Sequence, residues 1–381
     1  MRTSVKFYHV AFFLAVLVVA ACDKKNDEPA VVPTAFEWPQ TALTKSLNKE
    51  QLKYIDQTNK FGFTMFAKAL EINKGEDILI SPLATQMVKA MMINQMDTKF
   101  VNPGKEILID KDFNDYFEAV GSLILNMNNK EMPLGLANAV MFETGEFKHE
   151  FNPETADLYK KDYFTELFEV NCTLPEGERP GDKWAQEKSK NMIKIIPHIE
   201  RPSSLDSLQL GFYLSNVFCL SGTLDEEPIV VHKDNYCSAR SMPIKDGSLF
   251  LTVIEPAGAS SLAELSSNLN NKMWQNIREN VVKIDEPVKF GGLKKSFTIN
   301  DFYDFLDEDF KVLYWNTANR WNPKNLDELL IDVFLKITLD AHVELKGNSD
   351  SKGQTTGNPF IYVISEAGTG LILFMGTFSG M

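Results

Sequence analysis

The sequence predicts an α+β fold in which helices pack around a large, mostly antiparallel sheet that is completed by a C-terminal hairpin. Two kinds of apolar pattern occur along the chain. Some segments have apolar residues at helical spacing, and others are short runs of β-branched and aromatic residues bounded by Gly or Pro, which are typical of buried strands. Near the C-terminus, residues 360–364 and 371–375 are two such apolar runs around a polar, glycine-containing connector. A hairpin that is apolar on both faces must be buried, so it closes a core built by the preceding chain.

The composition is that of a soluble globular protein. Hydrophobic residues make up 44% of the chain and charged residues 24%. A length of 381 residues is enough to build one large domain. The net charge of −13 argues against nucleic acid as a partner and against docking on anionic lipid through basic residues. We expect a monomer that binds no nucleic acid.

The first residues have the pattern of a secretory signal. Arg2 and Lys6 precede the apolar run Val10–Ala21, which is too short to span a bilayer. Cys22 follows two alanines, and this resembles a bacterial lipoprotein processing site at which Cys22 becomes the lipidated first residue. Removal of residues 1–21 would change the net charge from −13 to −15, because only Arg2 and Lys6 are charged there.

We therefore expect a lipid-anchored protein of the bacterial cell envelope, at the outer membrane or cell surface, with simple secretion as the alternative. The membrane would be contacted only through the acyl chains. Residues 22–42 are rich in proline and charge, which predicts a flexible tether. The predicted organisation is a signal peptide over 1–21, the tether over 22–42 and a folded domain over 43–381.

Periodicity gives a coarse order of elements. Helical spacing predicts helices over 49–72, 83–96, 147–161, 184–198 and 262–279. Short apolar runs predict strands at 78–80, 134–142, 164–170, 212–221, 249–254, 288–290 and 330–339. Ser81 is placed to cap the second helix, with Pro82 at its first turn. Asn138 and Asn216 each lie in the middle of an apolar strand, so each must find hydrogen-bond partners.

Several segments resemble the serpin family, in order, over about residues 45–381. They include Ile78-Leu-Ile-Ser-Pro-Leu83, Leu136-Ala-Asn-Ala139, Leu214-Ser-Asn-Val-Phe218, Asn358-Pro-Phe360 and Leu373-Phe-Met-Gly376. The resemblance implies a buried polar cluster of Ser81, Asn138 and Asn216 beneath the main sheet. Ala84 and Val333 then stand at the cluster's two other positions.

The resemblance implies an inhibitor of serine or cysteine proteases that acts through an exposed reactive loop at about 341–357. The loop residues are Gly347, Asn348, Ser349, Asp350, Ser351, Lys352 and Gly353, with Lys352 as the scissile residue for a trypsin-like protease. The family's small-residue hinge is missing, however: Val343, Glu344, Leu345 and Lys346 stand there, and the loop is shorter. Two hypotheses therefore stay open: an inhibitor that traps its protease, and a non-inhibitory binding module on a serpin scaffold.

The sequence predicts no enzyme. It contains no G-x-S-x-G, G-x-x-x-x-G-K-[ST] or G-x-G-x-x-G pattern. The histidines after the signal are widely spaced and expected to face solvent, so we expect no metal site and no cofactor; they are His149, His198, His232 and His342. Cys172, Cys219 and Cys237 allow at most one disulfide, and Cys219 is expected to be buried. The acidic stretch 301–309 is expected to be a solvated helix face.

Overall fold

The computed structural model describes residues 34–74, 76–94, 111–143, 153–171, 174–197, 210–258, 260–284, 288–300, 302–305, 333–348 and 358–379. The predicted signal peptide, Cys22 and Cys172 lie outside these ranges. Residues 34–381 form one compact unit. Within the described residues, no helix is both long enough and apolar enough to cross a bilayer.

The helices are α1 (Ala42–Ser46), α2 (Lys49–Asn73), α3 (Pro82–Asn94), α4 (Lys111–Leu125), α5 (Pro153–Asp162), α6 (Pro180–Lys188), α7 (Leu262–Asn268), α8 (Asn271–Glu279) and the 3₁₀ turn η2 (Phe302–Phe305). The first strands are β1 (Thr34–Ala35), β2 (Leu79–Ile80), β3 (Leu134–Glu143), β4 (Thr165–Val170), β5 (Leu210–Thr223), β6 (Ile229–Lys233) and β7 (Cys237–Ile244). The others are β8 (Leu249–Pro256), β9 (Val282–Ile284), β10 (Gly292–Ile299), β11 (Val333–Lys346), β12 (Phe360–Glu366) and β13 (Ile372–Phe378).

The strands form two sheets, which confirms the predicted α+β class. The eight-stranded sheet has the order β1-β9-β6-β7-β8-β12-β13-β2, and all of its pairs are antiparallel. The five-stranded sheet has the order β10-β11-β5-β3-β4 and is mixed, because β11 pairs with β5 and β3 with β4 in parallel. Most strand pairs are therefore antiparallel, as predicted. The two exceptions, β11 with β5 and β3 with β4, both lie in the sheet that contains Asn138 and Asn216.

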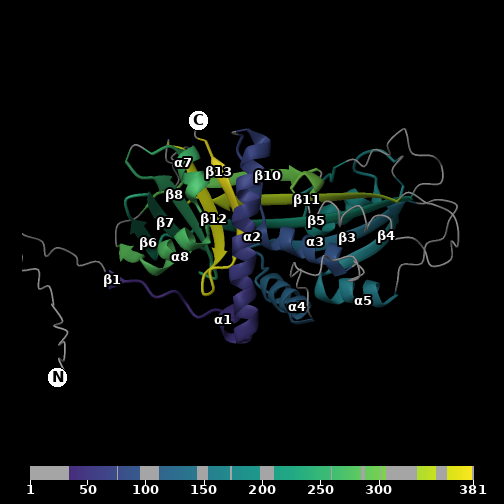
Figure 1. The fold of residues 1–381 in the computed structure, drawn as a ribbon, viewed down its shortest axis with the longest axis horizontal. Helices are drawn as coiled ribbons and strands as arrows, with labels where there is room; N and C mark the ends of the chain where they lie inside the picture. The colour runs from purple at the N-terminus through teal and green to yellow at the C-terminus, as the bar shows by residue number, and fades with distance from the viewer. Residues whose placement is uncertain are drawn as a thin grey trace, which may run out of the picture. The chain divides into compact units, whose positions relative to one another are not determined.

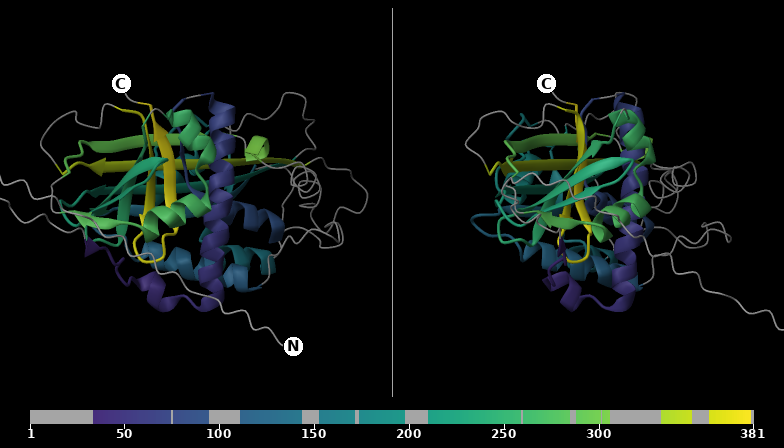
Figure 2. Two further views of the ribbon diagram at one scale, coloured as in Figure 1. Left: turned by 60° about the vertical axis from the view of Figure 1, so that its left-hand side comes forward. Right: turned by 90° about the vertical axis from the view of Figure 1, so that its left-hand side faces the viewer.

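The C-terminal hairpin β12–β13 is buried as the sequence predicts. Residues 360–367 and 371–376 are all buried, and the hairpin lies between β8 and β2 in the eight-stranded sheet. Figures 1 and 2 show this hairpin running across the direction of β11, with α2 packed alongside it. Both faces are covered, so the core of the folded unit is assembled around the last strands of the chain.

The first two long helices begin where the sequence predicts. Asn48 caps α2, because its side chain accepts hydrogen bonds from the amides of Glu50 and Gln51. Ser81 Oγ accepts from the amide of Ala84, at 3.1 Å, at the start of α3. These caps satisfy amides that the first turn of a helix leaves without an intrahelical partner.

Two predicted helices differ from the structure. The helix expected over 184–198 is α6, which begins at Pro180 and ends at Lys188. It stops there because Lys190 and Asn191 adopt left-handed conformations, with φ of 56° and 64°. The helix expected over 262–279 is split into α7 and α8, because Asn270 is extended and caps α8 through the amide of Met273.

The strand expected at 288–290 is also misplaced, since those residues are irregular and β10 begins at Gly292. The three-residue strand β9, which lies between β6 and β1, is too short to give a periodic signal. The predicted tether ends earlier than residue 42, because β1 pairs with β9 and Trp38 packs against Phe250 at 5.1 Å between ring centroids. Residues 34–42 are therefore part of the folded unit.

Gly376 on β13 provides a test of how closely the hairpin and β2 approach each other. A Cβ atom there would lie 2.1 Å from the carbonyl oxygen of Ile78 and 2.3 Å from Tyr362 Oη. We expect Gly376→Ala to lower the free energy of unfolding by about 2 kcal/mol or more, since backbone must move to relieve the overlap. Urea denaturation measures the change.

Gly222→Ala is the matched control. It lies in a strand as well, but the nearest atom to its added Cβ is a side-chain methyl of Ile244 at 2.9 Å, which can move more easily. A loss at Gly376 no larger than that at Gly222 would contradict the proposed backbone overlap.

Candidate functional site: the junction of β5 and β11

The parallel pairing of β5 with β11 forms a continuous junction in the middle of the five-stranded sheet, called here the β5–β11 junction. Its register runs from Val333 opposite Leu210 to Lys346 opposite Thr223, with no interruption. Figure 1 shows the two strands side by side. Every residue of the 14-residue strand β11 has a partner on β5, so the sheet is closed along this whole length.

The last residues of β11 are held from both sides. On the β5 side, the amide of Leu224 donates to the carbonyl of Lys346 at 3.0 Å. On the β10 side, Asn348 Oδ1 accepts from the amide of Phe290 at 2.9 Å, and Asn348 Nδ2 donates to the carbonyl of Val288 at 2.9 Å. Asn348, two residues after the end of β11, is therefore bound to the segment that precedes β10.

This geometry corrects the predicted start of the loop. The loop was expected at about 341–357, with Val343–Lys346 as the hinge, but β11 extends to Lys346. The segment between β11 and β12 is 347–359. The pattern of residues 338–346 already contains the signal, since polar and apolar residues alternate strictly, as in a half-buried strand.

Beneath the junction, the predicted polar cluster is present only in part. Asn216 Nδ2 donates to Asn138 Oδ1 at 2.9 Å, and Asn138 Nδ2 donates to the carbonyl of Tyr163 at 2.6 Å. The two asparagines face each other on the neighbouring strands β5 and β3, opposite in register. Ser81 bonds within its own helix turn, and no bond joins it to either asparagine.

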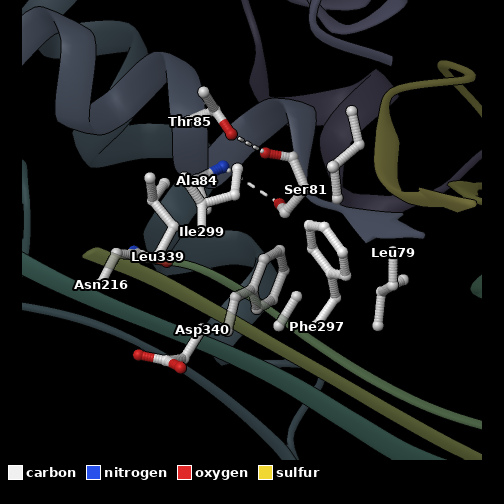
Figure 3. A pocket seen from close by; sticks show the side chains of 12 residues that line it. Leu79, Ser81, Ala84, Thr85, Asn216, Phe297, Ile299, Leu339 and Asp340 are labelled. Carbon is white, nitrogen blue, oxygen red and sulfur yellow. Dashed lines mark hydrogen bonds between the residues drawn. The ribbon is translucent and has the colours of Figure 1, made fainter. Parts of the chain in front are cut away.

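Ser81, Ala84 and Asn216 line a cavity of about 10 Å³ under the sheet, which is close to the minimum that holds one water. Figure 3 shows Ser81 and Thr85 on one side of it and Phe297 and Leu339 on the other. The expected position of Val333 in this cluster is wrong. Val333 pairs with Leu210 at the far end of β11, whereas the residue opposite Asn216 is Leu339.

The opposite face of β11 carries a row of polar pairs with β10, which sequence reasoning missed. Thr298 Oγ1 donates to Asp340 Oδ1 at 2.6 Å, and Ser296 Oγ lies 2.7 Å from His342 Nδ1. The third pair is an ion pair between Lys294 and Glu344 at 2.9 Å. Toward β5, Thr338 Oγ1 and Ser215 Oγ lie 2.9 Å apart and form a side-chain hydrogen bond across the junction itself.

Asp340 is the most unusual member of this row. Its side chain is buried, and its second carboxylate oxygen, Oδ2, has no hydrogen-bond partner. Burial raises the pKa of this carboxyl to about 7, and the bond from Thr298 opposes that shift only in part. Asp340 is one of the residues that line the cavity, but in Figure 3 its carboxylate is directed away from Ser81, toward the opposite face of the sheet.

The structure brings together some of the predicted site residues. Gly347 and Asn348 lie at the end of β11, while Ser349, Asp350, Ser351, Lys352 and Gly353 fall outside the described residues, as does Cys22. The expectation of solvent-facing histidines is wrong for His232 and His342, which are 5% and 6% exposed. Cys219 is buried as expected, and Cys237 is buried too; both are free thiols.

The arrangement of two sheets, with parallel central strands and a buried C-terminal hairpin, is the serpin fold. The thermophilic serpin tengpin in its native state superposes with a TM-score of 0.65 at 16% identity, covering 88% of this chain and 95% of tengpin. Native protease nexin-1 with heparin matches with a TM-score of 0.63 at 16% identity, over 87% of this chain and all of that one. Serpin48 from the insect Tenebrio molitor matches with a TM-score of 0.61 at 15% identity, covering 88% of this chain and all of that one.

The sequence itself supports the same assignment. Residues 56–227 match the family model described as Serpin (serine protease inhibitor). The chain therefore has the serpin fold, and residues 56–227 resemble the serpin family in sequence. No curated protein sequence matches it.

The raised pKa of the Asp340 carboxyl predicts how the stability of the folded protein depends on pH. The carboxyl has a raised pKa in the folded protein, so folding favours the protonated form, and stability falls as pH rises from the unfolded value near 4 to about 7. We expect Asp340→Asn, which keeps an acceptor for Thr298, to be more stable than the wild type at pH 8. The advantage over the wild type should be roughly 2 kcal/mol larger at pH 8 than at pH 5.

Urea denaturation of both proteins at both pH values measures this difference. Glu344→Gln is the control, because this carboxyl lies in the same row but is more exposed, and Lys294 lowers its pKa. An advantage of Asp340→Asn that is the same at pH 5 and pH 8 would contradict a carboxyl with a raised pKa.

Proposed function

We propose that this protein is a lipid-anchored serpin of a bacterial cell envelope that binds a serine or cysteine protease through residues 347–359 without trapping it. Resemblance to a family of protease inhibitors supports the partner class. The observation that argues against trapping is the small number of residues between β11 and β12 compared with the length of the β5–β11 junction.

Trapping requires the cleaved loop to enter the sheet as a strand between β5 and β11. Cleavage after Lys352 would leave only the six residues Gly347–Lys352 attached to β11. Fully extended they reach about 20 Å, before any are used to reverse the chain direction, whereas the 14 residues of β5 span about 46 Å. Even cleavage after Gly357 leaves eleven residues.

The composition of this segment and the bonds at its start support the same proposal. Insertion would place Asp350 or Lys352 in the sheet, and its three glycines at 347, 353 and 357 form strands poorly. It would also break the bonds of Asn348 to Phe290 and Val288. We infer that a bound protease is released when the complex dissociates and is not carried along the sheet.

A second candidate, the trapping inhibitor, is favoured by one observation. β5 and β11 are direct parallel neighbours, which is an arrangement that could accept an antiparallel strand between them. A partner unrelated to proteases is the remaining outcome of the test below.

Incubation with a trypsin-like protease tests the mode of binding. We expect reversible inhibition with no adduct that survives SDS, and a nicked protein whose melting temperature stays within about 5 °C of the intact one, because no strand is added to the sheet. Inhibition assays, denaturing gels and thermal melts of both forms measure these outcomes.

Lys352→Ala is the matched control and should lose inhibition of a trypsin-like protease while melting as the wild type does. An SDS-stable adduct, or a rise of tens of degrees on nicking, would establish trapping and overturn the proposal. Absence of inhibition against trypsin-like and cysteine proteases alike would favour a non-protease partner.

The lipid anchor has a separate test. Expression of the full chain in a bacterium fed an alkyne-labelled fatty acid should give a labelled protein in the membrane fraction, because two or more acyl chains hold a protein stably on a bilayer. Cys22→Ser should abolish both labelling and membrane fractionation, whereas Cys172→Ser should leave both unchanged. Label retained in Cys22→Ser would contradict lipidation at Cys22.

A further inference from the structure

The hairpin between β6 and β7 holds three side chains that bear metal-binding atoms. The hairpin closes at Asp234, whose amide donates to the carbonyl of Cys237 at 3.0 Å. Asp234 Oδ1 accepts from the amides of Tyr236 and Cys237 at 2.8 and 2.9 Å. Because these bonds fix the carboxylate, its other oxygen, Oδ2, is held toward His232 on β6.

The contacts of His232 leave an unusual pair of atoms facing each other. Nδ1 lies 3.1 Å from the carbonyl oxygen of Asn280, and a carbonyl only accepts, so Nδ1 carries a hydrogen. In the neutral ring Nε2 then has a lone pair, which is 3.1 Å from Asp234 Oδ2. Two acceptors at this distance repel unless a positive charge, either a second ring proton or a metal ion, lies between them.

The thiol of Cys237 completes a possible ligand set. One ligand atom from each of His232, Asp234 and Cys237 lies within 4.8 Å of the others. Around a tetrahedral zinc ion, with bonds of about 2.0–2.3 Å, such atoms are about 3.3–3.6 Å apart. The His232 and Asp234 atoms are already nearly that far apart. Small side-chain movements would bring the Cys237 sulfur to the same distance from both of them.

We propose that His232, Asp234 and Cys237 bind a Zn²⁺ ion. Imidazole, carboxylate and thiolate are the ligand types that zinc accepts, and this mixture of nitrogen and sulfur disfavours magnesium and calcium. The thiol proton is released to solvent as the Zn–S bond forms. The Asn280 carbonyl holds the imidazole ring in the orientation and tautomer that a metal ligand needs.

The surroundings leave room for a fourth ligand. His232 and Cys237 are buried, but the side chain of Asp234 is 26% exposed, so a water can reach the ion from that side. Asn276 Nδ2 lies 3.4 Å from Asp234 Oδ2 and is a weak competitor for that oxygen. The ion would tie the β6–β7 turn to the end of α8, where Asn276 and Asn280 lie, and so stabilise the edge of the eight-stranded sheet.

Titration of the chelator-treated, reduced full chain with Co²⁺ and Zn²⁺ tests the proposal. We expect a single Co²⁺ ion per chain with thiolate-to-cobalt charge-transfer absorption in the near ultraviolet, its displacement by Zn²⁺, and a higher melting temperature with Zn²⁺ because only the folded chain assembles the site. Asp234→Asn keeps an oxygen for the two turn amides but removes the anionic ligand, so it should weaken binding about tenfold or more.

Two cysteine variants separate this site from other thiols. Cys237→Ser should abolish the charge-transfer absorption, whereas Cys219→Ser should retain it, because Cys219 is buried elsewhere, on β5. Absorption that persists in Cys237→Ser, or a wild-type chain that takes up no metal, would show that the His232–Asp234 pair is an ordinary ion pair. None of these readouts depends on a protease, so the zinc site and the proposed function can fail independently.

Discussion

The parallel pairing of β5 with β11 is the constraint on which the rest of this structure depends. Backbone amides and carbonyls in a central strand must be paired, so separating the two strands exposes groups that need new partners. An inserted strand supplies those partners only as far as it reaches, and the residues after Lys346 reach only part of the 14-residue junction. Leu224 and Asn348 add bonds at the end where separation would begin. Under the proposed function, the lengths of these two segments matter more for trapping than any single side chain.

The two faces of β11 contribute differently to this junction. Toward the cavity, Leu339 and Ala341 share a mostly apolar lining, and the nearby pair of Asn138 and Asn216 lies on β3 and β5, two strands that remain paired. Toward the other face, Asp340 and its neighbours bond mainly to β10, so that β10 and β11 are joined by side chains as well as by backbone. The side-chain bond between Thr338 and Ser215 crosses to β5. If the sheet opened, the division would thus fall between β5 and β11, with β10 remaining attached to β11.

Most elements with strong periodicity could be predicted from sequence, including α2, α3, β5 and the C-terminal hairpin. The errors have physical causes. Aligning Asp340 to the family pattern placed Val343–Lys346 in a loop, although strict alternation through residue 346 is typical of a strand. Lys190 and Asn191 end the helical path after α6 by adopting left-handed conformations, which propensity alone does not reveal. The His232–Asp234–Cys237 group escaped notice because its spacing matches no common motif and a hairpin turn brings the three residues together.

The segment around Trp38 is held to the rest of the fold partly through the carbonyls at the end of a helix. The last carbonyls of a helix have no intrahelical partner and must be satisfied from elsewhere. At the end of α8 the carbonyl of Arg278 accepts from Trp38 Nε1 at 2.9 Å, and the carbonyl of Asn280, the residue after the helix, lies 3.1 Å from His232 Nδ1. The guanidinium of Arg278 lies 4.0 Å from the Trp38 ring centre and donates to the carbonyl of Ala367 in the C-terminal hairpin. One helix end thus joins the N-terminal segment, the β6–β7 hairpin and the last strands, which explains why residues with the composition of a tether pack onto the folded unit at Trp38.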